Sequence, residues 1–163
     1  IDKFEISDPP IKISKDFVAN IENLYPKKDT ILFSKDGSIG IAYKLEHDME
    51  AVTSSALLHL TVKNPGVILP NYLTLVLNSP IVQLQAERDC NGAIIQHWKP
   101  SEIANVLIPV LDMSLQEEIA DKIQESFRLR AASKRLLDLA VKTVESAIET
   151  DEKSALLWLA SQK

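Results

Sequence analysis

Hydrophobic and polar residues follow two different patterns along the chain, and the change between them lies near residue 110. Before that point, short apolar runs are separated by turn residues, a pattern typical of strands. The runs at residues 30–33, 55–62 and 106–110 therefore predict strands. Apolar positions resume after Ser38, which predicts that the first run is one arm of a hairpin.

Residues 69–88 instead carry apolar side chains at helical spacing. Pro70 stands at the expected helix start, and Pro80 predicts a bend or a restart because proline cannot donate a helical hydrogen bond. The region before residue 110 therefore predicts a compact α+β unit.

The residues after 112 predict one long helix. All 4 glycines and all 8 prolines lie at or before Pro109, so no strong helix breaker follows. Ser114 and Glu117 form a capping-box pattern at the start of the apolar periodicity. The periodicity continues to about Glu149, which gives a helix roughly 50 Å long at 1.5 Å per residue. Residues 151–163 predict either a continuation of this helix or a short second one.

The apolar stripe of the long helix is too extended to be buried against a domain of about 110 residues, so part of it is expected to pack on another helix. The stripe is also broader than two positions per heptad, which favours contact with more than one helix. A helix folded back on its own domain is the alternative. The expected interface residues are Ile123, Phe127, Leu136, Leu137, Leu139, Val141, Val144 and Ile148.

Together these patterns predict an α+β fold. A compact domain at 1–112 precedes a long helix at 113–150, which is expected to pair in a coiled coil or helical bundle, and a helical or flexible tail at 151–163.

Composition and charge narrow the function. The net charge is −5, with 10 Lys and Arg against 13 Asp and Glu up to Val110, and 8 against 10 after it. Neither part is a basic module, so any DNA binding would have to depend on local patches or on the charge of a partner. Cys90 is the only cysteine, which excludes an internal disulfide. Because no apolar run approaches the roughly 20 residues of a membrane span and the first residues do not resemble a signal peptide, we expect a cytoplasmic protein.

The sequence has little that predicts catalysis. His47, His59 and His97 are far apart and none has a second ligand type at the spacing of a metal site. The glycine-rich phosphate loop, the dinucleotide-binding turn and the nucleophile elbow of hydrolases are all missing. We therefore expect no cofactor, no metal and no catalytic residue.

Polar residues interrupt the apolar pattern at two places, and their side chains are of the types that contact phosphates and base edges. From composition alone, solvated loops are the competing interpretation, and Asp36 with Gly37 is also an ordinary hairpin turn. The candidates for DNA contact are Ser34, Lys35, Asp36, Gly37, Ser38, Asn91, Gln96, His97 and Lys99.

The order of these motifs resembles one half of the specificity subunit of type I restriction-modification systems. In that family a target recognition domain is followed by a long helix, and the arrangement usually occurs twice in one chain. The family pattern G-D-[IV]-L-x-S-x-x-G-S-[ILT]-G is matched by Asp29, Ile31, Leu32, Ser34, Gly37, Ser38 and Gly40. A later pattern, in which a glycine turn leads to an I-P-[LV]-P strand and a helix, is matched by Gly92, Ile95, Ile108, Pro109, Glu118 and Ile119.

The resemblance covers roughly residues 25 to 148 and has departures. Lys28 replaces the first glycine of the pattern, Ala93 replaces its usual Ser or Thr, and Leu111 with Asp112 stand at its second proline. The opening strand usual in the family and the second half are missing. The chain is therefore expected to be a half-subunit that pairs, a truncated form, or the recognition end of a larger methyltransferase.

The resemblance implies a protein without catalytic activity of its own, which recognises one half-site in double-stranded DNA. It implies adenine methyltransferase (modification) subunits as direct partners, a restriction subunit as an indirect one, and a homodimer through the long helix if the chain is a half-subunit. The helix would then set the distance between half-sites. An oligomerising scaffold that binds a protein or small ligand is the alternative from another class, and an enzyme completed by a methyltransferase chain is a third.

Overall fold

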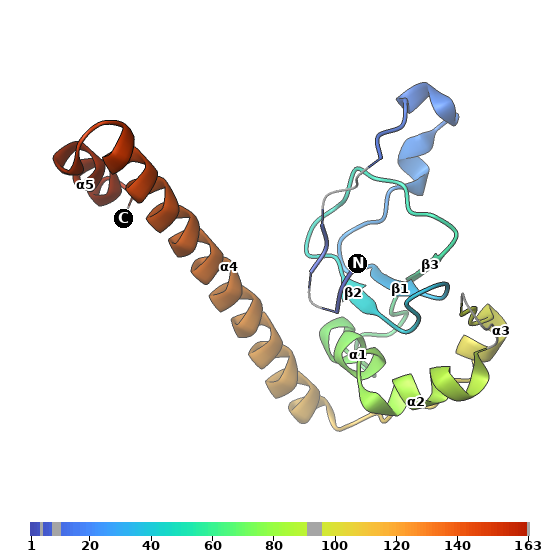
Figure 1. Ribbon diagram of the computed structural model, residues 1–163. Coiled ribbons are helices and arrows are strands. Elements are labelled where there is room, and N and C mark those ends of the chain that lie inside the picture. The colour runs from blue at the N-terminus through green and yellow to red at the C-terminus, as the bar shows by residue number, and fades with distance from the viewer. Residues whose placement is uncertain (4, 8–10, 91–95, 163) are drawn as a thin grey trace. The chain divides into compact units, whose positions relative to one another are not determined.

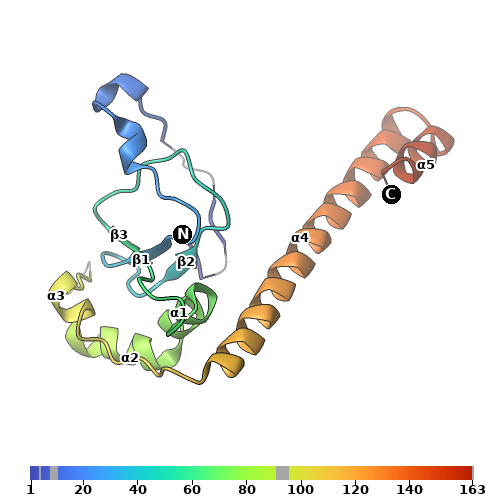
Figure 2. The same ribbon diagram turned by 180° about the vertical axis from the view of Figure 1, so that it is seen from behind.

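The computed structural model describes residues 1–3, 5–7, 11–90 and 96–162. The chain divides into two compact units, residues 1–120 and 121–163, which are described in turn. Figures 1 and 2 show the first unit as a small sheet with short helices and the second as a pair of helices.

A three-stranded antiparallel sheet forms the centre of the first unit. It contains β1 (Ile31–Ser34), β2 (Ala42–Lys44) and β3 (Leu57–Leu60), in the order β2-β1-β3. All four residues of the central strand β1 are buried. The strands predicted at residues 30–33 and 55–62 and the hairpin after Ser38 are thus confirmed.

The strand predicted at 106–110 is wrong, because this segment has no strand neighbour in the described part of the chain. A side chain takes the place of a neighbouring strand: Gln85 Oε1 accepts from Leu107 N at 2.9 Å and Gln85 Nε2 donates to Leu107 O at 2.8 Å. Tyr72 Oη donates to Pro109 O at 2.9 Å. Side chains can therefore hold an apolar run in an extended form. The hydrophobic periodicity of the sequence does not distinguish such a segment from a strand.

Two helices follow the sheet and restart at the predicted proline. The first is α1 (Pro70–Leu77) and the second is α2 (Pro80–Asp89), and both begin with proline. In Figure 1 they run along one side of the sheet, where α1 packs against β2. A further short helix, α3 (Pro100–Ile103), and two 3-10 turns, Lys15–Phe17 and Ile21–Leu24, complete the elements before residue 110.

Asn78, between α1 and α2, fixes these helices to the edge of the sheet. Its side chain is buried, accepts from Ala42 N at 3.0 Å and donates to Ala42 O at 2.8 Å and to Thr74 O at 3.0 Å. The amide therefore satisfies the outward-facing polar groups of β2, which would otherwise have no strand to pair with.

The hydrophobic core lies between the sheet and the helices. Phe33 from β1 and Trp98 are its largest fully buried residues, with ring centroids 5.7 Å apart. The other buried members of the cluster are Ile31, Ile39, Ala42, Tyr72, Val76, Leu77, Val82 and Ala86.

The predicted long helix is α4 (Met113–Glu149), with 37 residues. It begins one residue before Ser114, so Ser114 lies inside the first turn and the expected capping position is corrected. The carbonyl of Asp112 accepts from Leu115 N and Gln116 N at 3.1 and 3.0 Å. Gln116, fully buried, donates to Val67 O and Leu111 O and accepts from Leu69 N at distances of 2.8 to 3.0 Å, which fixes the first turn of α4 to the segment before α1.

The second unit is a helical hairpin. A separate helix, α5 (Glu152–Ala160), follows α4, and the side chain of Asp151 caps it by accepting from Ser154 N at 3.0 Å. Ala155 is 1% exposed, and Arg135 Nη2 donates to Gln162 O at 2.7 Å. The tail therefore packs back on α4 as a short second helix. No helix in the described residues is both long and apolar enough to span a membrane.

Candidate nucleic-acid interface

Two loops that the sequence predicts as separate contact regions lie side by side. The hairpin loop, residues 35–41, joins β1 to β2, and the second loop, residues 96–99, precedes α3. Asp36 and His97 form an isolated antiparallel bridge, in which Gly37 N donates to the carbonyl of residue 96 at 3.0 Å and residue 98 donates to Lys35 O at 2.8 Å. We refer to the two loops together as the loop pair.

The shape of the hairpin loop depends on two glycines and one serine. Gly37 and Gly40 have φ values of +78° and +74°, a conformation that L side chains rarely adopt. Ser34 is buried, and its hydroxyl accepts from Ile41 N at 2.9 Å and donates to Ser38 O at 2.5 Å. The structure thus gives Ser34 a supporting position beneath the loop.

Gln83 on α2 holds the loop from below. Its Nε2 donates to Gly40 O at 2.6 Å, and a Cβ at position 40 would lie 2.6 Å from the same nitrogen. Both the close approach of the Gln83 amide and the left-handed backbone of residue 40 therefore require glycine at this position.

Trp98 anchors the second loop in the core. Its side chain is 1% exposed and packs on Phe33, while the neighbouring His97 side chain is 62% exposed. The buried Trp98 therefore fixes the backbone that carries the exposed His97 side chain.

The polar side chains of the loop pair meet at Asp36. Its Oδ2 lies 2.6 Å from Lys35 Nζ and its Oδ1 lies 2.8 Å from His97 Nδ1. The hydrogen bonds from Lys35 and then from His97 hold the pKa of the Asp36 carboxyl below its ordinary value, despite a smaller opposing effect of desolvation. The carboxylate is therefore ionised at neutral pH and accepts from both loops.

Both lysines of the loop pair form ion pairs with nearby acids, so the loop pair is not a free basic patch. Lys35 and Lys99 of the loop pair face Asp36 at 2.6 Å and Glu102 at 3.5 Å. Away from the loops the pairs are Lys27 with Asp48, and Lys44 with Asp29 and Glu46.

The remaining predicted contact residues are distributed unevenly. Gly37, Ser38, Gln96, His97 and Lys99 are exposed, whereas Lys35 is half-buried. Asn91 lies outside the described residues. Sequence reasoning did not identify Trp98 or Gln83 as parts of the site, because their contacts join segments far apart in the chain.

The predicted interface on α4 separates into two faces. Leu137, Val141, Val144 and Ile148 are exposed and follow one another at spacings of 4, 3 and 4 residues. At about 100° per residue, they lie within roughly 60° of one another, whereas Leu139 lies about 160° from Leu137.

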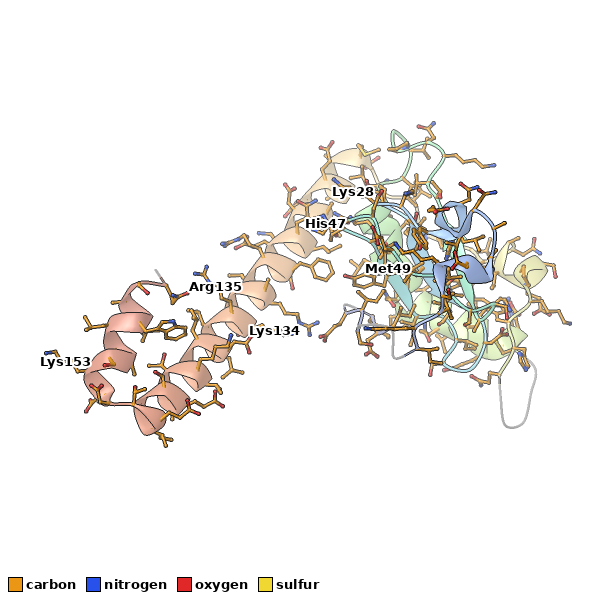
Figure 3. All side chains as sticks on the ribbon, turned by 90° about the horizontal axis from the view of Figure 1, so that it is seen from above. Lys28, His47, Met49, Lys134, Arg135 and Lys153 are labelled. Atoms are coloured by element: carbon orange, nitrogen blue, oxygen red, sulfur yellow. The ribbon has the colours of Figure 1, made fainter. Side chains whose placement is uncertain are left out.

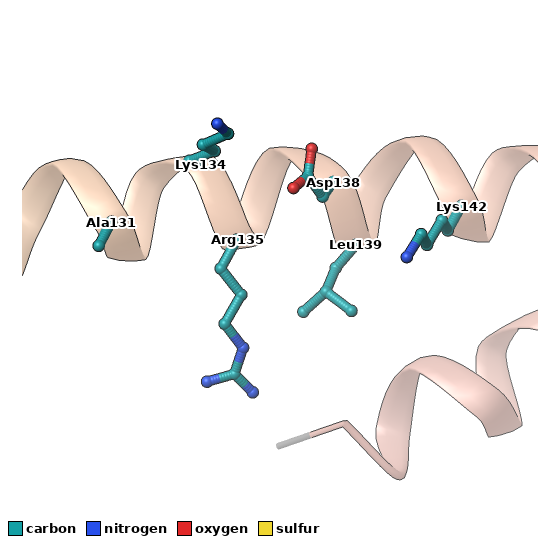
Figure 4. Close-up of a pocket in the computed structure, with 6 residues that line it drawn as sticks. All are labelled: Ala131, Lys134, Arg135, Asp138, Leu139 and Lys142. Carbon is teal, nitrogen blue, oxygen red and sulfur yellow. The ribbon is translucent and has the colours of Figure 1, made fainter. Parts of the chain in front are cut away.

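Leu139 is half-buried and, in Figure 4, points toward α5 together with Arg135. The internal partner α5 thus covers the Leu139 face. Ile123 and Phe127 are half-buried and Leu136 is exposed.

Several cations lie along the helical hairpin. Lys134, Arg135 and Lys142 of α4 line a shallow groove with Asp138, and Lys153 comes from α5 (Figures 3 and 4).

Within the described ranges, no group of three or more His, Cys, Asp or Glu side chains is placed to hold a metal ion.

One protein-family model matches most of the chain. Residues 3–138 match the model of the type I restriction modification DNA specificity domain. None of the curated proteins matches the chain.

A similar fold occurs in the crystal structure of a type I restriction-modification system S subunit from M. genitalium. The TM-score is 0.56 at 19% sequence identity, over 82% of this chain and 36% of that one. The chain thus spans little more than a third of the length of that subunit, and the likeness concerns the fold.

Proposed function

Because this chain belongs to the family of type I restriction modification DNA specificity domains, we propose that it recognises one half-site of double-stranded DNA and carries out no catalysis itself. In this proposal it works in the cytoplasm and positions adenine methyltransferase subunits directly and a restriction subunit through them.

The observation that supports this role most is the loop pair. Two loops are joined by backbone hydrogen bonds, supported from below by Trp98 and Gln83, and carry exposed polar side chains. Fixed side chains at the end of a rigid hairpin lose little conformational freedom on binding, which favours a specific contact over an adaptable one.

Because the lysines of the loop pair are in ion pairs, we infer that base recognition and phosphate neutralisation come from different subunits. Affinity for DNA comes largely from neutralised phosphates, and the loop pair has little unpaired positive charge to contribute. We therefore assign base recognition to the loop pair and much of the phosphate neutralisation to partner subunits.

Duplex binding as a function of salt tests this proposal. The full chain should bind a duplex that contains its site at low salt and lose affinity as salt rises, with a shallow slope because few phosphates are contacted. Binding should weaken in Lys35→Ala and in His97→Ala and persist in Lys63→Ala.

Lys63 is a suitable control because it is an exposed lysine that follows the end of β3 remote from the loop pair, as the register of β3 on β1 shows. No duplex affinity at low salt, alone and with methyltransferase subunits, would contradict the proposal.

We also propose that the exposed face of α4, formed by Leu137, Val141, Val144 and Ile148, pairs with a helix of another chain. The 4, 3 and 4 spacing is that of a coiled-coil seam, and α5 occupies a different face. A second copy of the chain is the partner expected of a half-subunit, since an antiparallel pair would place two recognition domains on two half-sites.

The mass of the chain in solution tests the helix pairing. Leu137→Asp combined with Val144→Asp should convert an associated species to a monomer by light scattering, with unchanged helical circular dichroism. The control, Leu137→Ile with Val144→Leu, keeps the seam apolar and should stay associated. Equal masses for all three proteins would exclude self-association through this face.

The same exposed face favours the second candidate function, an oligomerising scaffold that binds a protein or small ligand. The two candidates differ in the salt titration, because a scaffold has no affinity for a duplex even at low salt.

A further inference from the structure

The hydrogen bonds at Asp36 determine which nitrogen of His97 carries the hydrogen. An ionised carboxylate can only accept hydrogen bonds. Since Asp36 Oδ1 lies 2.8 Å from His97 Nδ1, that nitrogen must be the donor. In the neutral imidazole the other nitrogen, Nε2, then has no hydrogen and acts as an acceptor.

The other oxygen of the Asp36 carboxylate accepts a hydrogen bond from a group that can only donate. Asp36 Oδ2 lies 2.6 Å from Lys35 Nζ, and an ammonium group has three hydrogens and no acceptor. One carboxylate thus fixes a donor from the hairpin loop and an acceptor from the second loop. The His97 side chain is 62% exposed, so its remaining nitrogen is available to a ligand. The Lys35 side chain is 20% exposed, so it offers a smaller part of its surface.

A donor and an acceptor that are held by one carboxylate match the hydrogen-bonding groups of one base edge in the major groove. Adenine presents N7 as an acceptor and the N6 amino group as a donor, whereas guanine presents two acceptors, N7 and O6. Thymine and cytosine each offer only one hydrogen-bonding group there. Guanine would place its O6 against the lone pair of His97 Nε2.

We propose that His97 and Lys35 select adenine over guanine at one base pair of the bound duplex, with Asp36 as the positioning residue that sets the histidine tautomer. This inference rests on the proposed DNA-recognition function and adds the base and the residues that choose it.

A single substitution should reverse the preference. In Asp36→Asn the new amide oxygen must stay toward Lys35, because the ammonium can only be met by an acceptor. The amide NH2 then faces His97 Nδ1, which becomes the acceptor, and the ring hydrogen moves to Nε2. The site would present two donors, the complement of guanine N7 and O6.

The experiment is selection of bound duplexes from a randomised pool by the full chain, at a pH well above the range in which histidine titrates. The unmodified chain should enrich adenine over guanine at one position by roughly fivefold or more. His97→Ala should remove the preference there and leave the other positions unchanged, and Asp36→Asn should enrich guanine instead. Lys63→Ala serves as the control and should behave like the unmodified chain.

The possible results are distinguishable. Enrichment at several positions, with none that changes from adenine in His97→Ala, would overturn the base assignment while the DNA-binding function stands. An adenine preference that persists in Asp36→Asn would overturn the tautomer argument. No enrichment at any position, with the chain alone and with methyltransferase subunits added, would contradict the proposed function and this inference with it. Unchanged circular dichroism verifies that each variant is folded.

Discussion

Replacement of Gln116 by methionine should destabilise the first unit by about 2–3 kcal/mol. Methionine keeps the length of the side chain and removes its amide. Leu69 N loses its acceptor, and Val67 O and Leu111 O lose a donor. A buried polar group left without a partner costs about 1–3 kcal/mol, and exposed carbonyls recover part of that cost by binding water.

The loss is large relative to a total stability of about 5–15 kcal/mol and should lower the melting temperature by roughly 5–10 °C in a chain of this size. Urea unfolding gives the free energy directly. Trp98 reports on the first unit when Trp158→Phe removes the only other tryptophan. The matched control is Gln124→Met, an exposed position on the same helix, which should change stability by less than about 0.5 kcal/mol. Equal stability of the two variants would refute the argument that the Gln116 amide fixes α4 to the segment before α1.

Two further predictions concern the loop pair. Gly40→Ala should destabilise the protein by about 1–3 kcal/mol in urea unfolding, because it combines a left-handed backbone with displacement of the α2 amide that supports the loop. Gly37→Ala, with the same backbone but nothing within 4 Å of the new methyl, should cost less, and equal losses would contradict this. The pKa of Asp36, measured by NMR titration, should lie below its ordinary value because Lys35 and His97 donate to the carboxylate. Its folded pKa is depressed, so the stabilisation is present above the ordinary value and is lost as pH falls through the folded one. In His97→Ala the pKa should rise part of the way back, and an unchanged pKa would show that the His97 contact is not formed in solution.

The elements that depend on local signals could be predicted from the sequence. The hairpin, the restart at Pro80 and the long helix each follow from apolar spacing together with turn or breaker residues, which act over a few positions. The confirmed fold class and the resemblance to DNA specificity domains rest on the same motifs.

What the sequence could not supply depends on contacts between distant residues. The segment at 106–110 has the apolar pattern of a strand, but its Leu107 backbone is hydrogen-bonded by the Gln85 side chain of a helix and not by another strand. Nothing in the sequence around Gln116 and Trp98 indicates that the fold buries both side chains.

The two candidate loops could be identified by composition, but only the bridge between Asp36 and His97 shows that they form one surface. The hydrogen bond between the Asp36 and His97 side chains shows that polar groups of the two loops contact each other. A side-chain contact between residues 61 positions apart has no signature in the sequence.

The central claim is that the loop pair touches the duplex, and site-specific photo-cross-linking tests it most directly. A photoreactive residue at Ser38, which is exposed on the hairpin loop, should cross-link to a duplex that contains the recognised site. The same residue at Lys63, after the remote end of β3, should not. Cross-linking from position 63 but not from position 38 would place the duplex elsewhere and contradict the account.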